Sequence, residues 1–240
     1  MLALLVILFM LLLLIVLPLA HAGELAPGLG ESLVLTALFS AVASALALLP
    51  GLAVAMWGRA PGRGLAAQIL YVPAVVPPTA VGVLLLGSVT APGKICGWLG
   101  VDCRYVSEAL YGLFVNKPAG IVLAMFVMAL PVVYAVFDGA LREVRAEAYF
   151  RSLGFGGLKL LWLVLLSLRR AAASAFIFSF LRGFGELGVL LIFAAYPPTL
   201  PIYIYNSWLI YGVGPAVTAS LLTMAIGVVS AYVIRLWLSR

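Results

Sequence analysis

Residues 33–57 read LVLTALFSAVASALALLPGLAVAMW, a stretch of 25 positions without a charged side chain. An α-helix needs about 20 apolar residues to cross the hydrocarbon core of a bilayer. This stretch therefore predicts a membrane-spanning helix. Because such a helix exposes its side chains to lipid, its presence decides the class of fold before any motif is considered.

The composition of the whole chain agrees with this stretch. Of 240 residues, 65% are hydrophobic and 9% are charged, with 14 basic and 8 acidic side chains. Soluble domains carry roughly 25% charged residues. So few charges cannot cover a globule of this size with groups that water solvates. This excludes a soluble enzyme, an ordinary nucleic-acid-binding protein and a disordered chain.

Further uncharged runs predict an all-α membrane protein with six transmembrane helices. The run 187–234 is too long for one helix, and the prolines within 196–201 divide it because proline removes a helix hydrogen bond. The predicted spans form one transmembrane domain, 1–240, and cover about residues 2–20, 33–57, 65–89, 118–137, 171–195 and 215–234.

Basic residues are distributed unevenly between the linking segments. With a cytoplasmic N-terminus, ten of them lie inside, three lie outside and Arg182 lies within a span. Lys and Arg favour cytoplasmic loops, so we expect a multi-pass protein of the cell membrane with both termini in the cytoplasm. The inner side chains are Arg59, Arg63, Arg142, Arg145, Arg151, Lys159, Arg169, Arg170, Arg235 and Arg240, and the outer ones are Lys94, Arg104 and Lys117.

The first predicted span has a second interpretation. Ala20 and Ala22 have the small-residue spacing of a signal-peptidase site, but no basic residue precedes the apolar run. Retention and cleavage of this segment both stay open.

Cys96 and Cys103 fall in the outer segment between the third and fourth predicted spans. The outer side of the membrane is oxidising, which favours a disulfide over two free thiols. Two cysteines and one distant histidine make a poor metal site, so we expect none.

Arg182 and Glu186 are the charged residues inside the predicted spans. Ionisable groups in hydrocarbon are costly and usually face the bundle interior or a water-filled path. Their i, i+4 spacing places them on one helix face, where they can pair. The pair either lines a translocation pathway and its gate or holds helices together.

Two further patterns lie within the spans. Residues 183–188 match G-x-G-x-x-G, but no strand precedes them, so close helix packing explains the glycines better than nucleotide binding does. Pro77, Pro78 and Thr79 interrupt the third span. A double proline leaves carbonyls unpaired, which protein or water must satisfy. These three residues are candidates for pathway-lining backbone, with a simple kink as the alternative.

The inner segment 138–170 contains a mixed-charge helical stretch, glycines at 154, 156 and 157, and a second apolar stretch. Glycines of this kind end helices. Two helices joined by a glycine turn at the cytoplasmic face suit docking to a soluble partner, whereas the alternative is a solvated loop. Connections this long are usually functional.

Part of this segment resembles the EAA loop of ABC-importer permeases, the element that inserts into a cleft of the ATPase subunit. The corresponding residues are Glu147, Ala148, Tyr149, Phe150 and Gly154. The spacing departs from the family pattern because Glu147 stands one place early, and Ser167 replaces a later proline. Gly154 is the position that matches best.

Residues 72–82 resemble the third-span signature of molybdate, tungstate and sulfate permeases. Residues 182–188 and 194–205 are similar to the molybdate and tungstate branch of that family. The resemblance extends over about residues 33–235.

The resemblance implies a homodimer that forms an oxyanion pathway, with two ATPase subunits that bind ATP and Mg²⁺ and an extracytoplasmic binding protein that delivers the anion. It implies no cofactor on this chain and no ATPase site of its own. Molybdate or tungstate is the expected substrate. A permease for sulfate or another solute is the alternative, followed by a secondary transporter or a channel. An intramembrane enzyme is disfavoured because Glu186 is the single carboxylate within a span.

Overall fold

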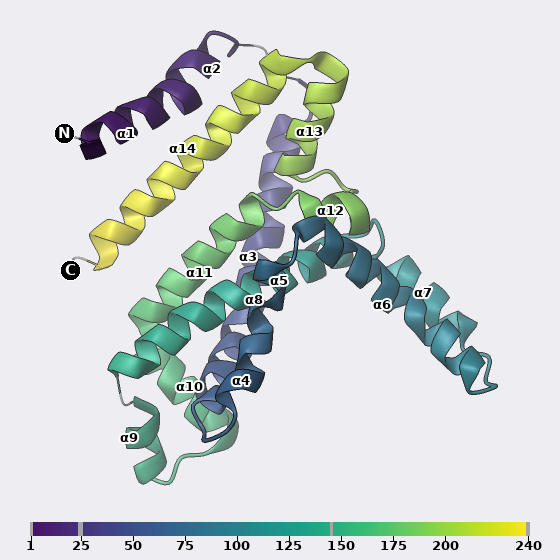
Figure 1. Cartoon of the computed structure of the whole chain (residues 1–240), viewed down its shortest axis with the longest axis vertical. Helices are drawn as coiled ribbons and strands as arrows, with labels where there is room; N and C mark the ends of the chain where they lie inside the picture. Colours follow the sequence, from purple (N-terminus) through teal and green to yellow (C-terminus); the bar gives the residue numbers. More distant parts are fainter. Residues whose placement is uncertain (1, 24–25, 145, 239–240) are drawn as a thin grey trace. The chain divides into compact units, whose positions relative to one another are not determined.

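The structure, a computed structural model, describes residues 2–23, 26–144 and 146–238, and its regular elements within these ranges are all helical (Figure 1). The predicted all-α fold class is therefore confirmed. Arg145 and Arg240, two of the predicted inner basic residues, lie outside the described residues, as does the side chain of Arg235. The chain divides into two compact units, residues 1–35 with 198–240, and residues 36–197. The single transmembrane domain 1–240 stays a prediction.

The first unit joins the two ends of the chain. A polar contact links its N-terminal and C-terminal parts, because the Tyr203 hydroxyl donates to the Ala26 carbonyl over 2.7 Å. Gly212, at φ +86°, makes the turn between the last two helices, which pack on each other. The helices of this unit are α1 (Leu2–Leu11), the π-helical turn η1 (Leu12–Val16), α2 (Leu17–Leu19), the start of α3 (Leu29–Gly58), α13 (Leu200–Tyr211) and α14 (Val213–Leu238).

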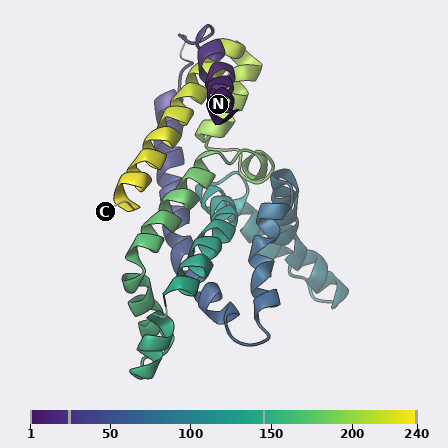
Figure 2. The same cartoon turned by 60° about the vertical axis from the view of Figure 1, so that its left-hand side comes forward.

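The second unit is built around α8 (Pro118–Glu143), whose inner face is buried along its whole length. Helix α11 (Arg169–Phe184) packs along α8, as both views show (Figure 2). Small residues let neighbouring helices approach closely, as membrane helices require. A Cβ added at Gly51 of α3 would lie 2.5 Å from Val133 Cγ1 of α8. Val133, Phe137 and Leu141 form the centre of this core.

The remaining helices of the second unit are short or paired. Helices α6 and α7 form a hairpin (Figure 1). The elements are α4 (Gly64–Ala67), the 3-10 turn η2 (Gln68–Tyr71), α5 (Val72–Val75), α6 (Pro78–Trp98), α7 (Arg104–Phe114), α9 (Ala146–Ser152), α10 (Gly157–Ser167) and α12 (Gly188–Phe193).

Four helices within the described residues are long and apolar enough to cross a membrane, namely Leu29–Gly58, Pro78–Trp98, Pro118–Glu143 and Val213–Ser230. Helices α10 and α11 meet at 86° and together add a fifth candidate. The N-terminal helical segment Leu4–Leu19 is apolar but shorter. The count of six spans stays a prediction.

Two predicted spans have different boundaries in the structure. The third, predicted at 65–89, is interrupted before Pro78, and the long helix α6 runs on to Trp98. The break follows from the double proline, because a residue before proline is pushed out of the helical region. Val76 accordingly has ψ 140°. The fifth span, predicted at 171–195, is divided after Phe184 into α11 and α12.

Candidate pathway and coupling sites

Glu186 lies in the break between α11 and α12, and its carboxylate makes two interactions. One oxygen pairs with the Arg182 guanidinium at 2.5 Å, as the i, i+4 spacing allows. The other accepts a hydrogen bond from the Val189 backbone N–H at 3.0 Å. The side chain of Glu186 is 1% exposed and that of Arg182 is 33% exposed. The buried carboxylate therefore neutralises a cation and caps the first turn of α12.

Helix α11 ends here, and the backbone hydrogen bond of Glu186 no longer has the i→i−4 spacing of an α-helix. Glu186 N–H donates to the Gly183 carbonyl, three residues back, at 3.1 Å. The Glu186 side chain then supplies an acceptor for one of the N–H groups that a helix start leaves free. A buried charge that is paired and hydrogen-bonded avoids most of the cost of leaving water. Glu186 thus lies between α11 and α12 and stabilises the start of α12.

The double-proline segment packs directly against this break. A Cβ added at Gly188 would lie 2.7 Å from Pro78 Cβ and 3.1 Å from the Thr79 nitrogen. One turn later, a Cβ added at Gly82 would lie 2.9 Å from the Val189 carbonyl oxygen. The structure therefore brings Pro78 and Thr79 onto the start of α12, two residues beyond Glu186. Pro77, the residue before α6, is exposed.

We name this contact the α6–α12 seam, formed by Pro78, Thr79, Gly82, Gly188 and Val189. It joins the two stretches that the sequence separately marks as irregular and apolar. The role of the seam and of the Arg182–Glu186 pair as gate residues stays a prediction.

Asn116 is a structural residue that the sequence analysis did not identify. It adopts φ +53°, which asparagine tolerates better than most residues. Its backbone N–H donates to the Phe193 carbonyl at 3.2 Å, and its side-chain oxygen accepts the Ala195 N–H at 2.9 Å. It thereby holds the end of α12 close to the start of α8. The sequence signal was Asn-Lys-Pro at 116–118, a turn pattern before a helix.

Cys96 and Cys103 are joined in a disulfide that closes the tip of the α6–α7 hairpin. Ser107 of α7 adds a second link. Its hydroxyl accepts the Gly93 N–H at 2.7 Å and donates to the Thr90 carbonyl at 3.1 Å. A proline at position 92 interrupts the bonding of α6 here, and Ser107 supplies partners to the backbone around it.

The predicted coupling segment forms α9, a turn and α10. Gly154 has φ +83°. Its N–H donates to the Arg151 carbonyl at 2.9 Å, and the Phe155 N–H donates to the Phe150 carbonyl at 3.1 Å. These two bonds and the Phe150–Phe155 ring contact at 6.4 Å make a Schellman motif, which ends a helix at a glycine. The sequence reading of Gly154 as a helix-ending glycine is confirmed.

Of the five residues that resemble the EAA loop, some are exposed and others hold the segment in place. Phe150 is half-buried and packs against the core of the second unit. Tyr149 is 62% exposed, and Ala148 is also exposed. Glu147 pairs with Arg151 at 2.8 Å on the same helix. The segment thus presents Ala148, Tyr149 and the Gly154 turn outward, while Phe150 anchors it.

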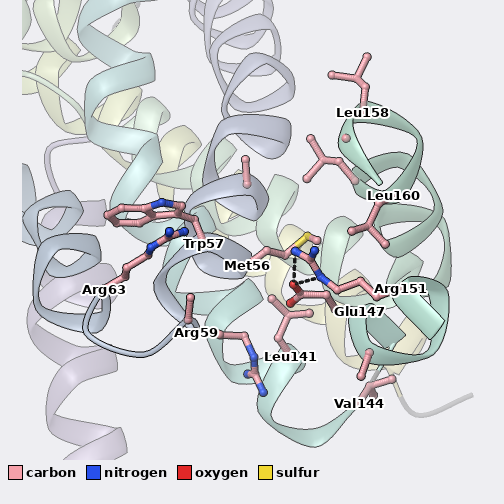
Figure 3. A pocket seen from close by; sticks show the side chains of 15 residues that line it. Met56, Trp57, Arg59, Arg63, Leu141, Val144, Glu147, Arg151, Leu158 and Leu160 are labelled. Carbon is pink, nitrogen blue, oxygen red and sulfur yellow. Dashed lines mark hydrogen bonds and ion pairs between the residues drawn. The ribbon is translucent and has the colours of Figure 1, made fainter. Parts of the chain in front are cut away.

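A cavity of about 870 Å³ lies between the end of α3, α9 and α10 (Figure 3). Arg59, Arg63 and Arg151 line it together with Glu147. Its apolar walls include Met56 and Leu160. The charge bias predicts that these arginines lie on one side of the membrane, but not that they share a cavity.

Comparison with known proteins places this architecture in a class. No protein-family model matches the sequence. The chain is 31% identical, over 219 residues, to a protein of Haloferax volcanii named a probable molybdenum ABC transporter permease protein, covering 86% of this chain and 76% of the relative. It is 28% identical, over 194 residues, to the molybdenum transport system permease protein ModB of Escherichia coli K12, covering 75% of this chain and 79% of that protein.

The all-helical fold, the apolar helices of membrane length and these similarities define a multi-pass membrane permease. The chain belongs to the ABC transporter permease family, in the group that contains the molybdenum permeases.

Proposed function

We propose that this chain is the transmembrane subunit of an ATP-driven importer for a tetrahedral metal oxyanion, molybdate or tungstate. The observation that carries the proposal is its similarity to molybdenum permeases over most of its length. Two copies would form the pathway, two ATPase subunits would bind ATP and Mg²⁺, and an extracytoplasmic protein would deliver the anion. The chain itself is a permease without an ATPase site.

The geometry of α9 supports a coupling role for residues 146–157. A coupling element must transmit force, so it needs a fixed shape and a firm attachment to the helices that it moves. The Schellman motif at Gly154 fixes the turn, and Phe150 attaches it to the core. The exposed Tyr149 is then available to the ATPase subunit.

The Arg182–Glu186 pair supports a pathway role for the α6–α12 seam. An unpaired carboxylate would repel an incoming dianion, whereas this one is neutralised by its neighbour. The Arg182 side chain is one third exposed, so part of it remains accessible. We propose that the pair lies at the wall of the dimer's pathway and contributes to its gate. In the proposed orientation, both termini of the chain lie in the cytoplasm.

The ligand specificity of the cognate binding protein tests the substrate. Isothermal titration calorimetry of that binding protein with molybdate, tungstate, sulfate and phosphate should show tight binding of molybdate and tungstate. Sulfate and phosphate should bind more weakly. Co-purification of this chain with an ATP-hydrolysing subunit tests the transporter class separately. Preference for sulfate would move the chain to the sulfate alternative, and absence of any ATPase partner would favour a secondary transporter or channel.

A further inference from the structure

The cavity near α9 lies where two membrane-length helices end. Helix α3 ends at Gly58 and α8 ends at Glu143, and residues close to both ends, Trp57 and Val144, line the cavity. Helices of this type end near the level of the lipid headgroups, since their apolar length matches the hydrocarbon core. With both helices in the bilayer, the cavity would lie near the surface of the membrane.

The charges that line the cavity are mainly positive. Three arginines and one carboxylate contribute to its wall (Figure 3). Glu147 is engaged by Arg151 through two guanidinium nitrogens, at 2.9 Å and 2.8 Å. Within the described parts of the chain, no ion pair involves Arg59 or Arg63, and both side chains are exposed. The two guanidinium groups, which point in different directions (Figure 3), are thus each available to an anion.

The same cavity has apolar surface at its edge. Leu158 is 82% exposed and Trp57 is 44% exposed. The Arg63 guanidinium lies over the Trp57 ring, 5.4 Å from its centre. Tryptophan with a cation beside it is typical of the membrane interface, where one end of the site is apolar and the other is hydrated. A small inorganic anion would leave this apolar surface in water.

We propose that this cavity binds an anionic phospholipid, with the headgroup phosphate at Arg59 and Arg63 and the acyl chains along Trp57 and Leu158. Basic pockets between membrane helices hold anionic headgroups in this way. The volume of about 870 Å³ suits a group much larger than a single tetrahedral anion. The bound lipid would connect α3 to α9 and α10, next to the proposed coupling segment. Lipid binding itself does not depend on the transported substrate.

The test measures lipid binding to the full-length chain, purified with any subunits that accompany it in neutral detergent. Native mass spectrometry would follow titration with phosphatidylglycerol, with phosphatidylcholine and with inorganic phosphate. The variant Arg59→Gln/Arg63→Gln removes the two available cations. The matched control, Arg169→Gln/Arg170→Gln, removes two exposed arginines at the start of α11 that do not line the cavity. Leu158→Gln alters the apolar edge without removing charge.

We expect the wild-type chain and the control to bind phosphatidylglycerol more tightly than phosphatidylcholine. Each arginine removed should weaken binding about fivefold, or about 25-fold for the double variant. Leu158→Gln should weaken lipid binding by a smaller factor. Equal lipid binding by the double variant and the control would overturn the proposal. Displacement of the lipid by millimolar phosphate would also overturn it, in favour of a free-anion site. If the double variant binds lipid as the wild type does but no longer co-purifies with the ATPase subunit, the proposal is also overturned, in favour of a protein interface.

Discussion

At the scale of single residues, Glu186 combines two roles that substitutions can separate. Its charge neutralises Arg182, and its second oxygen caps α12 through Val189. Glutamine keeps an oxygen at the capping position but removes the charge. Leucine removes both. Because the carboxylate is buried, the protein surroundings rather than water must compensate for each loss.

We predict that Glu186→Gln reduces oxyanion uptake more than it reduces the amount of folded protein. The amide can still accept the Val189 N–H, so the loss of stability should be smaller than for a variant that also removes this acceptor, while Arg182 loses its counter-ion at the proposed gate. Uptake by proteoliposomes and the amount of monodisperse protein in detergent measure the two effects. Wild-type uptake by this variant would assign the pair a purely structural role.

Glu186→Leu should instead impair folding. It leaves a partly buried guanidinium without its partner and an uncapped helix start, and breaking a buried pair costs about 3 kcal/mol. Thermal unfolding in detergent should show a clearly lower midpoint than for Glu186→Gln. Equal midpoints for the two variants would mean that the Val189 hydrogen bond contributes nothing to stability.

At the scale of elements, the α6–α12 seam depends on the absence of a side chain at Gly188. We predict that Gly188→Ala destabilises the protein by about 1–3 kcal/mol, since the added Cβ would collide with Pro78 Cβ and the Thr79 backbone. Gly185→Ala is the matched control, because nothing lies within 4 Å of a Cβ there and its φ is negative. Thermal stability in detergent should fall for position 188 and not for 185. The opposite order would contradict the packing of the seam.

The coupling segment depends on the left-handed conformation of Gly154. We predict that Gly154→Ala weakens association with the ATPase subunit, since a non-glycine residue in this conformation costs about 1 kcal/mol. Gly154→Asn should be milder because asparagine tolerates the conformation. Gly156→Ala is the control, at φ −144° with open space around it. Co-purification of the ATPase subunit measures the effect. Equal yields for all three variants would show that the turn does not matter for docking.

The sequence predicted these elements well where one physical rule dominates. Uncharged length indicated the long helices, and Gly154 indicated the end of α9. It failed where a side chain bonds to the backbone of a neighbouring turn. The fifth span is divided where Glu186 caps α12, and a hydropathy profile does not detect that hydrogen bond. The extension of α6 to Trp98 was missed because Lys94 falls within the helix near its end.

At the scale of the whole molecule, the long-range contacts could not be predicted from a single sequence. Pro78 was expected to interrupt a span and Gly188 to allow close helix packing, but nothing in the sequence places the two together. The cavity at the end of α3 likewise gathers Arg59 and Arg151 from segments far apart in the chain. Their shared side of the membrane was predictable from charge bias, whereas their proximity results from how α3, α8 and α9 pack.

The orientation of the protein in the membrane is a further prediction for the whole molecule. Because ten of the 14 basic residues belong to the segments predicted to be inside, Cys96 and Cys103 should face outward. After mild reduction, an impermeant thiol reagent should label both cysteines in intact cells. Labelling confined to inverted vesicles would reverse the topology and with it the assignment of α9 to the cytoplasm.

Uptake of radiolabelled molybdate tests directly whether this chain is part of an ATP-driven importer. The proteoliposomes would contain this chain and its ATPase subunits, with the binding protein supplied on the side of substrate entry. We predict that molybdate accumulates only with ATP hydrolysis and the loaded binding protein, and that tungstate competes with molybdate far better than sulfate does. Uptake driven by an ion gradient without ATP, or ATP-driven uptake of sulfate with no accumulation of molybdate, would contradict it.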